Sequence, residues 1–465
     1  MKGYFFPVLL SSVICVFFPS AIAPGPQFES RIIASGLSDP WSVAVGPDGD
    51  LWINESKGYR VLKIDPRTGR KIIVLDLNAE REFLAFDLLK EAKQATPQGG
   101  LMGLALHPEF SKGQPYVYLA YVYRHLDANR FLLRLARYRY DTARRELSSA
   151  QVICDTVPAS NDHNGGRMVI APIKGTPYLF YAVGDQGAGQ FSNGGRPNKA
   201  QDPLSYEGKI LRFNLKPSSK ESWIPVDNPI NQQSAVWSLG HRNPQGLAYT
   251  ELSGKDKLYS SEHGPYSDDE MNEVIKEGNY GHPLVIGYAE GNYDGLAASV
   301  STEKSYPGKW HTSYPVIRSE RSNADSIGKS FREPVYSFYP TAQSSLSKLF
   351  GTIQREEKAD WNAYAPSGIT VYRSTTIPAW NQSILITSLK QGKLLRLKLN
   401  ADGSVDHRVS EYFASRARYR DVAVSRDGSR IYLVTDSSAI TSGPTEDNPK
   451  ATNFRGCLLE FRLKR

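Results

Sequence analysis

Short apolar runs separated by polar turns recur six times along the chain. In each copy an apolar strand, a turn rich in Pro, Gly and Asp, and a second apolar strand follow one another. The copies are Trp41–Glu55 (WSVAVGPDGDLWINE), Gly100–Val122, Gly166–Asp185, Gln245–Glu262, Ser367–Lys390 and Arg420–Asp436. Such repetition is typical of repeat architectures, and short strands joined in hairpins indicate a propeller. The pattern predicts an all-β fold, a six-bladed β-propeller.

The two ends of the chain are predicted to lie in the same blade. Gln27–Ser35 and Cys457–Leu463 both have strand patterns, and pairing them would close the ring and remove free sheet edges. Uneven spacing between the copies predicts long loops, and the widest interval, Gly281–Asp360, is expected to be an insertion over one face. Helical patterns are weak, and Ala79–Ala95 is the one good helix candidate.

The first 23 residues have the pattern of a secretory signal peptide. Lys2 gives a positive start, Tyr4–Phe18 is nearly all apolar, and Ala21–Ala23 is a small-residue cleavage pattern. The apolar run is too short and too close to the terminus to predict a membrane span. Residues 24–465 are therefore expected to form a single propeller domain of a secreted, periplasmic protein, with no membrane span after cleavage.

The cysteines do not indicate a disulfide-rich protein. Cys15 lies within the apolar run, but Ser12–Ile14 before it is not the small pair that a lipoprotein site needs. After cleavage only Cys154 and Cys457 remain. These two can pair with each other or stay as buried thiols, and both options are open at this stage.

The chain is basic, with 56 Lys and Arg against 48 Asp and Glu and a formal net charge of +8. A basic surface can bind nucleic acid. Here the cations are scattered without a run of five, and the signal pattern implies export. We therefore expect no nucleic-acid partner, and a basic pocket for an acidic small molecule stays open.

The residues that flank the two strands of each copy should gather at one rim, because a hairpin returns the chain to the face that it left. This rim is expected to hold four cations, two carboxylates, a tryptophan and a histidine: Arg242, Lys390, Arg418, Arg420, Asp162, Asp185, Trp361 and His163. Four cations with few balancing acids suit an anionic ligand. A concave, polar and aromatic mouth of this kind is a default ligand site.

Three side chains at this rim have further chemistry. His163 beside Asp162 has the makings of an oriented general base, since histidine titrates near neutral pH. Trp361 is able to lie flat on a planar ring. Taken singly, a turn histidine is more often structural, a lone arginine is usually ion-paired, and a tryptophan usually packs. Their convergence on one rim favours a functional site.

A second cluster of polar residues follows the fourth copy. Asp268, Asp269 and Glu270 lie in a loop with Gly264 and Pro265, which free backbone carbonyls. Oxygen ligands of this kind suit Ca²⁺, although the spacing is not that of an EF-hand. The alternative is an ordinary solvated acidic loop.

Several of these motifs resemble those of the soluble quinoprotein glucose dehydrogenases, also called glucose/sorbosone dehydrogenases. The similar segments are Gln98–Leu101, Asp162–His163, Gly184–Gly187, Asn228–Pro229, Leu239–Ala248, Glu262–Pro265, Ser267–Glu270, Gly278–Gly281, Ser388–Lys390 and Arg418–Asp421. The resemblance runs from about Ser38 to the C-terminus. It implies a six-bladed propeller, in agreement with the repeats.

The resemblance also implies pyrroloquinoline quinone (PQQ) as cofactor, an acidic planar quinone. By the family pattern, His163 takes the proton of the sugar's anomeric hydroxyl, and Arg242 with a Ca²⁺ polarises the quinone. The positions matching PQQ contacts are Arg242, Asn243, Lys390, Arg418 and Arg420. Those matching sugar contacts or groups that orient His163 are Gln98, Asp162, Asp185, Gln190 and Trp361.

Two calcium sites are implied in the same way. The carbonyls of Gly264 and Pro265 match ligands of the Ca²⁺ bound to PQQ. A second, structural Ca²⁺ is matched by Glu270, Tyr280, Ile286, Tyr288 and Glu290.

The chain departs from the best-known glucose dehydrogenases at four of these places. His263 replaces Gln, Ala363 replaces a Thr that touches the cofactor, Glu290 replaces Asp, and Tyr266 replaces Asn. The segment Gly281–Asp360, which shapes the sugar cleft, aligns poorly, so glucose and a broader range of aldoses are equally plausible substrates.

The expected function is periplasmic, PQQ- and calcium-dependent oxidation of an aldose at the anomeric carbon to the lactone. Two alternatives belong to other classes: a calcium-dependent lactonase-like hydrolase, and a propeller that only binds a partner. The electron acceptor is not specified by the sequence, and a homodimer stays open.

Overall fold

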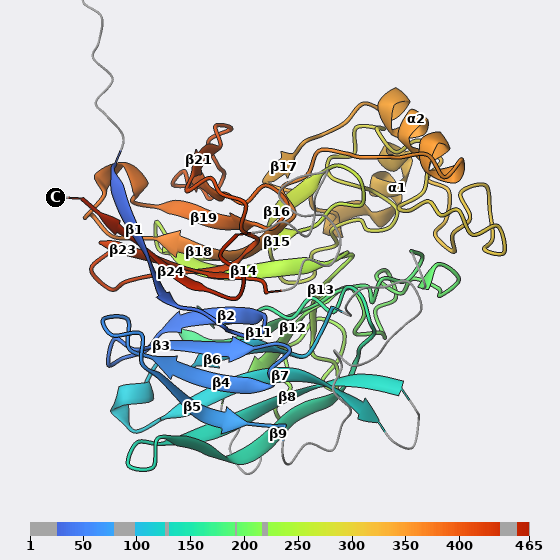
Figure 1. Ribbon diagram of the computed structural model, residues 1–465. Coiled ribbons are helices and arrows are strands. Elements are labelled where there is room, and N and C mark those ends of the chain that lie inside the picture. Colours follow the sequence, from blue (N-terminus) through green and yellow to red (C-terminus); the bar gives the residue numbers. More distant parts are fainter. Residues whose placement is uncertain are drawn as a thin grey trace, which may run out of the picture.

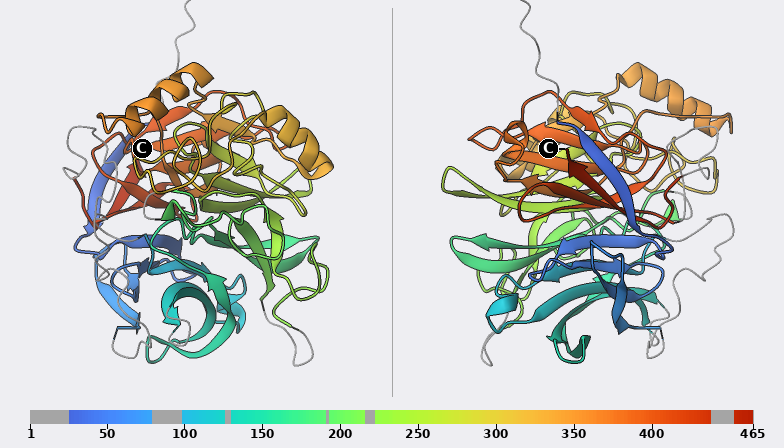
Figure 2. Two further views of the ribbon diagram at one scale, coloured as in Figure 1. Left: turned by 90° about the vertical axis from the view of Figure 1, so that its right-hand side faces the viewer. Right: turned by 60° about the vertical axis from the view of Figure 1, so that its left-hand side comes forward.

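The computed structural model describes residues 26–78, 98–125, 130–190, 193–215, 222–437 and 453–464. In this part of the chain, six antiparallel four-stranded sheets are arranged in a ring (Figures 1 and 2). The predicted six-bladed propeller is confirmed. Each repeated sequence copy forms the first two strands of one blade, so the pattern of apolar runs located every blade.

The first three blades follow the chain in order. Their strands are β2 (Pro40–Val45), β3 (Leu51–Glu55), β4 (Arg60–Ile64) and β5 (Lys71–Asp76); β6 (Leu101–Leu106), β7 (Tyr116–His125), β8 (Arg130–Asp141) and β9 (Glu146–Pro158); β10 (Met168–Ile173), β11 (Thr176–Val183), β12 (Lys209–Asn214) and β13 (Val236–Leu239). In each blade the first strand is innermost, and the next three pair outward in sequence order.

The other three blades complete the ring. Their strands are β14 (Pro244–Leu252), β15 (Lys255–Glu262), β16 (Asp269–Glu273) and β17 (Tyr336–Phe338); β18 (Pro366–Tyr372), β19 (Ser383–Ser388), β20 (Leu394–Lys398) and β21 (Ser410–Tyr412); β22 (Tyr419–Val424), β23 (Arg430–Thr435), β24 (Leu458–Leu463) and β1 (Phe28–Ala34). The N-terminal β1 pairs with the C-terminal β24, from Phe28 opposite Leu463 to Ala34 opposite Leu458. The predicted shared blade is confirmed.

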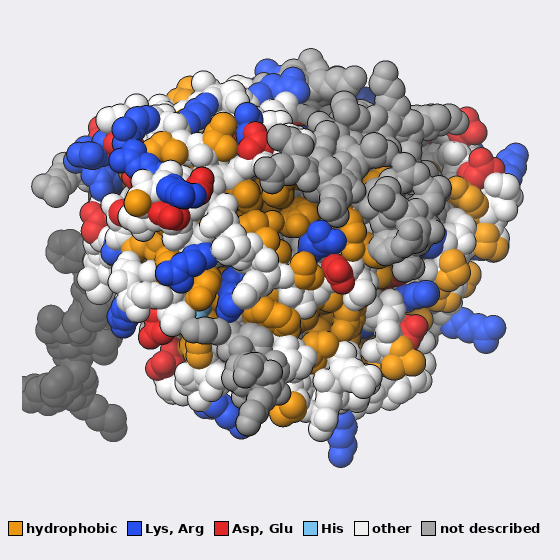
Figure 3. Space-filling model, turned by 90° about the horizontal axis from the view of Figure 1, so that it is seen from below, with side chains coloured by type: hydrophobic (Ala, Val, Ile, Leu, Met, Phe, Trp, Pro, Cys, Tyr) orange, Lys and Arg blue, Asp and Glu red, His pale blue; other side chains and the backbone are white. Residues whose placement is uncertain are grey.

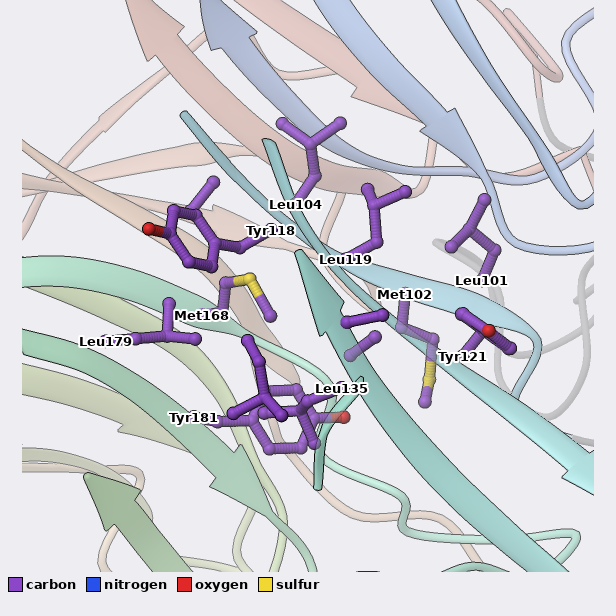
Figure 4. Packing of buried hydrophobic residues seen from close by; sticks show 14 of the residues in the cluster. Leu101, Met102, Leu104, Tyr118, Leu119, Tyr121, Leu135, Met168, Leu179 and Tyr181 are labelled. Carbon is purple, nitrogen blue, oxygen red and sulfur yellow. The ribbon is translucent and has the colours of Figure 1, made fainter. Parts of the chain in front are cut away.

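The blades are held together by apolar side chains packed between neighbouring sheets. Figure 4 shows one such region between the second and third blades. The side chains labelled there are Leu101, Met102, Leu104, Tyr118, Leu119, Tyr121, Leu135, Met168, Leu179 and Tyr181. Burial of such side chains contributes most of the favourable free energy of folding.

The first strands of the six blades line a central cavity of about 420 Å³. Arg167 crosses one end of it and is only 4% exposed. Its guanidinium binds Asp421 at 2.8 Å and donates to the carbonyls of Trp41 and Gln245. These contacts tie the first, fourth and sixth blades together on the axis.

The interval 281–360 forms an insertion on one side of the propeller, as predicted. It contains β17 and two helices, α1 (Glu320–Ile327) and α2 (Gln343–Gln354), which Figures 1 and 2 show on the same side of the ring. The described chain is mostly strands, as expected, but the sequence analysis did not locate these two helices. In α2 only Leu346 and Phe350 are buried, which is too sparse an apolar stripe to stand out in the sequence. Short 3₁₀ turns cover Phe110–Lys112, Gly328–Ser330 and Pro378–Trp380.

Three other expectations concern the ends and surface of the chain. The signal peptide and the helix candidate Ala79–Ala95 lie outside the described residues.

Cys154 and Cys457 are both free thiols, in the second and sixth blades, so they do not pair. Within the described ranges, no helix is both long and apolar enough to cross a membrane. On the face in Figure 3, Lys and Arg side chains are interspersed with acidic and uncharged ones.

Candidate active site

His163 precedes β10 in an unusual backbone conformation. Its φ of 46° lies in the left-handed region, which costs about 1–3 kcal/mol and persists only where the surroundings impose it. Its N–H donates to Asp162 Oδ1 at 3.0 Å. Gly184, which follows β11, packs so closely that a Cβ there would be 2.1 Å from the carbonyl oxygen of His163. The close approach brings Asp185 next to the imidazole.

Asp185, not Asp162, holds the imidazole ring. Asp185 Oδ1 lies 2.7 Å from His163 Nδ1, whereas Asp162 Oδ1 is 4.0 Å from Nε2. Asp185 is fully buried. Burial opposes its ionisation, but nearby His163 and the hydrogen bonds from His163 and His282 lower the pKa of Asp185 well below its usual range. Asp185 is therefore a carboxylate that accepts a hydrogen bond from Nδ1–H of His163.

The hydrogen bonds of Gln190 fix the tautomer of His163. Arg242 Nη2 can only donate, and it contacts Gln190 Oε1 at 2.8 Å. Gln190 Nε2 is thus the amide donor, and it lies 2.8 Å from both Asp162 Oδ2 and His163 Nε2. His163 Nε2 consequently accepts, and Nδ1 carries the proton. This is the tautomer that a general base needs, with its lone pair at Nε2.

Arg242 connects this base to the fourth blade. Its Nη1 donates to the carbonyl of His263 at 3.2 Å, and its backbone N–H donates to Glu262. In the described part of the chain, no carboxylate lies within ion-pair distance of this guanidinium, and its buried Nε has no hydrogen-bond partner. A buried donor without a partner is costly, so the site is suited to a negatively charged or electron-rich group.

The other three cations are balanced by acids to a degree that the sequence analysis did not anticipate. Asp436 binds both Arg418, at 3.2 Å, and Arg420, at 2.8 Å. Lys390 binds Asp360 at 3.0 Å. The expectation of few balancing acids is therefore corrected. Asp39 also acts on the charge of Arg418, so the cation in the mouth that is left without an ion-pair partner in the described chain is Arg242.

A buried glutamine links two of the expected cofactor contacts. Gln245 Nε2 donates to Asn243 Oδ1 at 2.8 Å, and Gln245 Oε1 accepts from Arg420 Nη1 at 3.0 Å. The Arg420 guanidinium also lies over the ring of Trp41, 4.2 Å from its centroid. Since Arg167 donates to the carbonyl of Gln245, the axial arginine supports this arrangement from below.

His263, where the resemblance expects Gln, lies among the cationic groups. Burial, and then the charges of Arg242, His163, Arg420 and Arg418, lower the pKa of His263 well below its usual value. Its Nε2 is buried without a hydrogen-bond partner in the described chain. His263 is thus a neutral imidazole in the middle of the mouth.

The two remaining expected sugar contacts lie at the edges of this group. The N–H of Gln98 donates to the carbonyl of Asn161 at 2.8 Å, which places Gln98 beside the loop of His163. Trp361 is half-buried, packs edge-on against Tyr266 and has Lys390 Nζ 5.0 Å from its ring centroid. The structure therefore places both next to other predicted site residues.

In the acidic loop, Asp269 is engaged in hydrogen bonds, whereas two backbone carbonyls are not. Asp269 accepts hydrogen bonds from the backbone N–H groups of Gly264, Tyr364 and Ala365, which uses its oxygens structurally. No hydrogen bond to the carbonyls of Gly264 or Pro265 is found among the described residues. In the same ranges, no group of three His, Cys, Asp or Glu side chains is spaced to hold a metal on its own.

The predicted second calcium site contains strongly buried carboxylates. Burial, and then the nearby Glu262, raise the pKa of Glu270 to about 8. Burial raises the pKa of Asp268 to about 6, with nearby Glu290 adding to the shift. Glu270 accepts hydrogen bonds from Asn272 and from the N–H of Gly287, beside Ile286. Tyr280 donates its hydroxyl to the carbonyl of Glu273 at 2.5 Å.

Sequence comparison now gives the family of this chain. A model of the glucose/sorbosone dehydrogenase family matches residues 37–324 and 354–441, most of the chain. The chain belongs to this family. Quinoprotein glucose dehydrogenase B of Acinetobacter calcoaceticus is 32% identical over 476 residues, covering 96% of this chain and 93% of that protein. An aldose sugar dehydrogenase of Escherichia coli is 27% identical over 351 residues, covering 74% and 76%.

Solved structures of similar proteins share the fold. The PQQ-bound aldose sugar dehydrogenase of Streptomyces coelicolor has a TM-score of 0.61 at 23% identity and covers 95% of this chain and 100% of that chain. The apo-form of the soluble aldose sugar dehydrogenase of Escherichia coli has a TM-score of 0.63 at 23% identity, covering 94% and 100%.

Several residues that complete the site in this family member were not singled out from the sequence. They are Asn198, Gln245, His282, Tyr314, Asp360 and Asp436. Asp436 directly follows β23 and lies in a segment that the repeats placed at the rim, but it was not counted among the carboxylates of the mouth. Gln245 is the second residue of β14, and the other four come from long loops whose path the strand pattern does not specify.

Proposed function

We propose that this member of the glucose/sorbosone dehydrogenase family is a PQQ- and calcium-dependent aldose dehydrogenase. It would oxidise a glucose-like sugar at the anomeric carbon to the lactone. The chain of hydrogen bonds from Arg242 through Gln190 and His163 to Asp185 carries the proposal, because it presents an unprotonated Nε2 beside a cationic mouth. The names of its relatives, a quinoprotein glucose dehydrogenase and an aldose sugar dehydrogenase, support the same chemistry.

The residues of the site supply the proton transfer. His163 Nε2 would take the proton of the anomeric hydroxyl while the hydrogen on the anomeric carbon leaves as hydride. Asp185 would stabilise the imidazolium so formed, as a buried carboxylate does for a neighbouring histidine. PQQ, when bound, supplies the acceptor for the hydride. Gln190 occupies Nε2 in this structure, so a sugar hydroxyl would take over that contact.

The cationic mouth fits an acidic, planar cofactor. Arg242, Asn243, Lys390, Arg418 and Arg420 are the residues that we propose to hold PQQ. The unpartnered Nε of Arg242 is the observation that supports the fit. Gln98 and Trp361 would contact the sugar from the edges of the mouth.

We propose two calcium ions. The carbonyls of Gly264 and Pro265 would bind the Ca²⁺ next to PQQ, since carbonyl oxygens are suitable calcium ligands. The second ion would be surrounded by Glu270, Tyr280, Ile286, Tyr288 and Glu290. Its positive charge would offset the cost of ionising the buried Glu270 carboxyl. The signal-peptide pattern supports export to the periplasm.

Reconstitution tests the proposal. The purified protein, with PQQ and Ca²⁺, is mixed with a dye acceptor and a panel of aldoses. Dye bleaching that requires PQQ, Ca²⁺ and at least one aldose is the expected result. Failure to bleach with every aldose contradicts the proposal. Hydrolysis of a lactone by the protein without PQQ would indicate the lactonase-like alternative instead.

A further inference from the structure

Asp185 is bound by far more donors than the orientation of one histidine requires. Its Oδ1 accepts from His163 Nδ1 at 2.7 Å and from the N–H of Gly187 at 3.0 Å. Its Oδ2 accepts from Tyr314 Oη at 2.7 Å, His282 Nε2 at 2.9 Å and Asn198 Nδ2 at 3.0 Å. Asn198 lies in the same connection between β11 and β12 as Asp185, whereas His282 and Tyr314 come from the segment between β16 and β17.

Tyr314 makes the shortest of the three contacts to Oδ2, and it belongs to the inserted segment between β16 and β17. The ring lies against Gly189, where a Cβ would be only 2.6 Å from it, and it meets the His282 ring edge-on with centroids 5.5 Å apart. Thr312 donates its hydroxyl to the carbonyl of Gly189 and accepts from the N–H of Tyr314 at 3.2 Å. Tyr314 is 4% exposed, so its hydroxyl is fixed on Asp185.

We propose that Tyr314 is a positioning residue that sets the proton affinity of His163 through Asp185. Hydrogen bonds to Oδ2 draw negative charge away from Oδ1, so Asp185 stabilises a protonated His163 less than an unassisted carboxylate would. The inference rests on the proposed role of His163 as base. It assigns a function in the proton-transfer step to the inserted segment, which sequence alone placed only near the cleft.

Burial keeps Tyr314 a donor. Burial, and then the neighbouring Asp185, raise the pKa of Tyr314 well above its usual value, so the phenol retains its proton. The other ionisable groups that face His163 are Asp162 in its own loop, Arg242 before β14, His263 after β15 and, through Asp185, His282. Among the described residues, the hydrogen bond of the Tyr314 hydroxyl goes to Asp185 and to none of these groups.

The test is Tyr314→Phe, which keeps the ring and removes the hydroxyl. His163 is titrated by NMR in the PQQ-free protein with labelled histidine, and its resonance is assigned from His163→Gln. Gly187, Asn198 and His282 still donate to Asp185 in this variant. We therefore expect the pKa of His163 to rise by about 0.3–1 unit, which corresponds to the free energy of one hydrogen bond. The acid limb of kcat/KM in the reconstituted enzyme should move in the same direction, with the PQQ titration unchanged.

Two further variants make the outcome decisive. Asn198→Ala removes another donor to Oδ2 and should raise the pKa of His163 likewise, even if Tyr314→Phe does not fold. Tyr118→Phe removes a buried hydroxyl that donates to the carbonyl of Leu215 at 2.9 Å, and should lower Tm without moving His163. A pKa of His163 that is unchanged or lower in Tyr314→Phe and Asn198→Ala overturns the proposal. Because the titration needs no turnover, a wild-type protein that oxidises no aldose would contradict the proposed function separately.

Discussion

At the scale of single residues, the proposed role of His163 as base depends on which ring nitrogen carries the proton. The sequence pointed to Asp162 as the adjacent partner, but the ring is held by Asp185, which is 22 positions away and on the other side of a hairpin. Arg242 settles the orientation of Gln190, and Gln190 settles the tautomer. These assignments need distances between side chains from different blades.

Replacing His163 with Ala should remove the base. We expect kcat to fall by about 10²- to 10⁴-fold while PQQ still binds, because a positioned general base contributes about that much. Stopped-flow reduction of the reconstituted enzyme by glucose measures the effect. His407→Ala is the matched control, since His407 is exposed, and it should keep the wild-type rate. Normal turnover by His163→Ala would remove His163 from the mechanism.

Replacing Arg420 with Met should weaken cofactor binding. Arg418 would keep Asp436 paired, so the loss reports a charge-assisted contact, worth about 10- to 100-fold in Kd. Fluorescence titration with PQQ measures it. Arg430→Met is the control, because Arg430 starts β23 at the opposite end of the same blade. Equal PQQ affinity in both variants would place Arg420 outside the cofactor site.

At the scale of elements, the site is built where strand ends of different blades come close. Gly184 lets the end of β11 approach the loop before β10, and the N–H of Asp185 donates to the carbonyl of Arg242 at 2.7 Å. The end of β11, the loop before β10 and the segment before β14 therefore lie in direct contact. Strand patterns predicted that these segments share a rim, but not how tightly they pack.

Gly184→Ala should destabilise the protein and displace the base. A Cβ 2.1 Å from a backbone oxygen forces the strand end and the His163 loop apart, at a cost of about 1–3 kcal/mol. Calorimetry should show a lower Tm, and the reconstituted activity should fall. Gly351→Ala in α2 is the control, because its nearest neighbour is the mobile end of Arg355, and alanine favours a helix by about 0.5–1 kcal/mol. A Tm for Gly184→Ala at or above the wild-type value would contradict the close approach.

At the scale of the whole molecule, the ring is closed by β1 and β24, and the burial of Glu270 in the acidic loop couples folding to pH. The pKa of Glu270, about 8, lies above the ordinary value near 4 in an unfolded chain. Between these two pH values, the folded protein therefore keeps a proton on Glu270 that the unfolded chain has released. Its contribution to stability is present at low pH and is lost as pH rises toward about 8.

Glu270→Gln should therefore unfold with a weaker pH dependence than the wild type between about pH 6 and 8.5, measured in chelator. Calcium should raise the Tm of the wild type more at the upper end of this range, because binding competes with the proton there. In Glu270→Gln both the calcium shift and its pH dependence should shrink. A calcium shift that is the same in wild type and variant would place the ion elsewhere.

The sequence by itself determined the six blades, the shared closing blade, the rim and the chemical types at the mouth. It could do so because strand hairpins have a local period of two and because hairpins return to the same edge. It also carried the family motifs that the comparison confirms.

Only the tertiary structure decided how the charges are balanced and which atoms touch. Asp436 pairs with two arginines, the two cysteines lie apart, helix α2 forms on a sparse apolar stripe, and Tyr314 reaches Asp185 across 129 positions. Each depends on the path of a long loop or on contacts between distant segments. No local pattern encodes such contacts, since their energy arises only when the whole ring has closed.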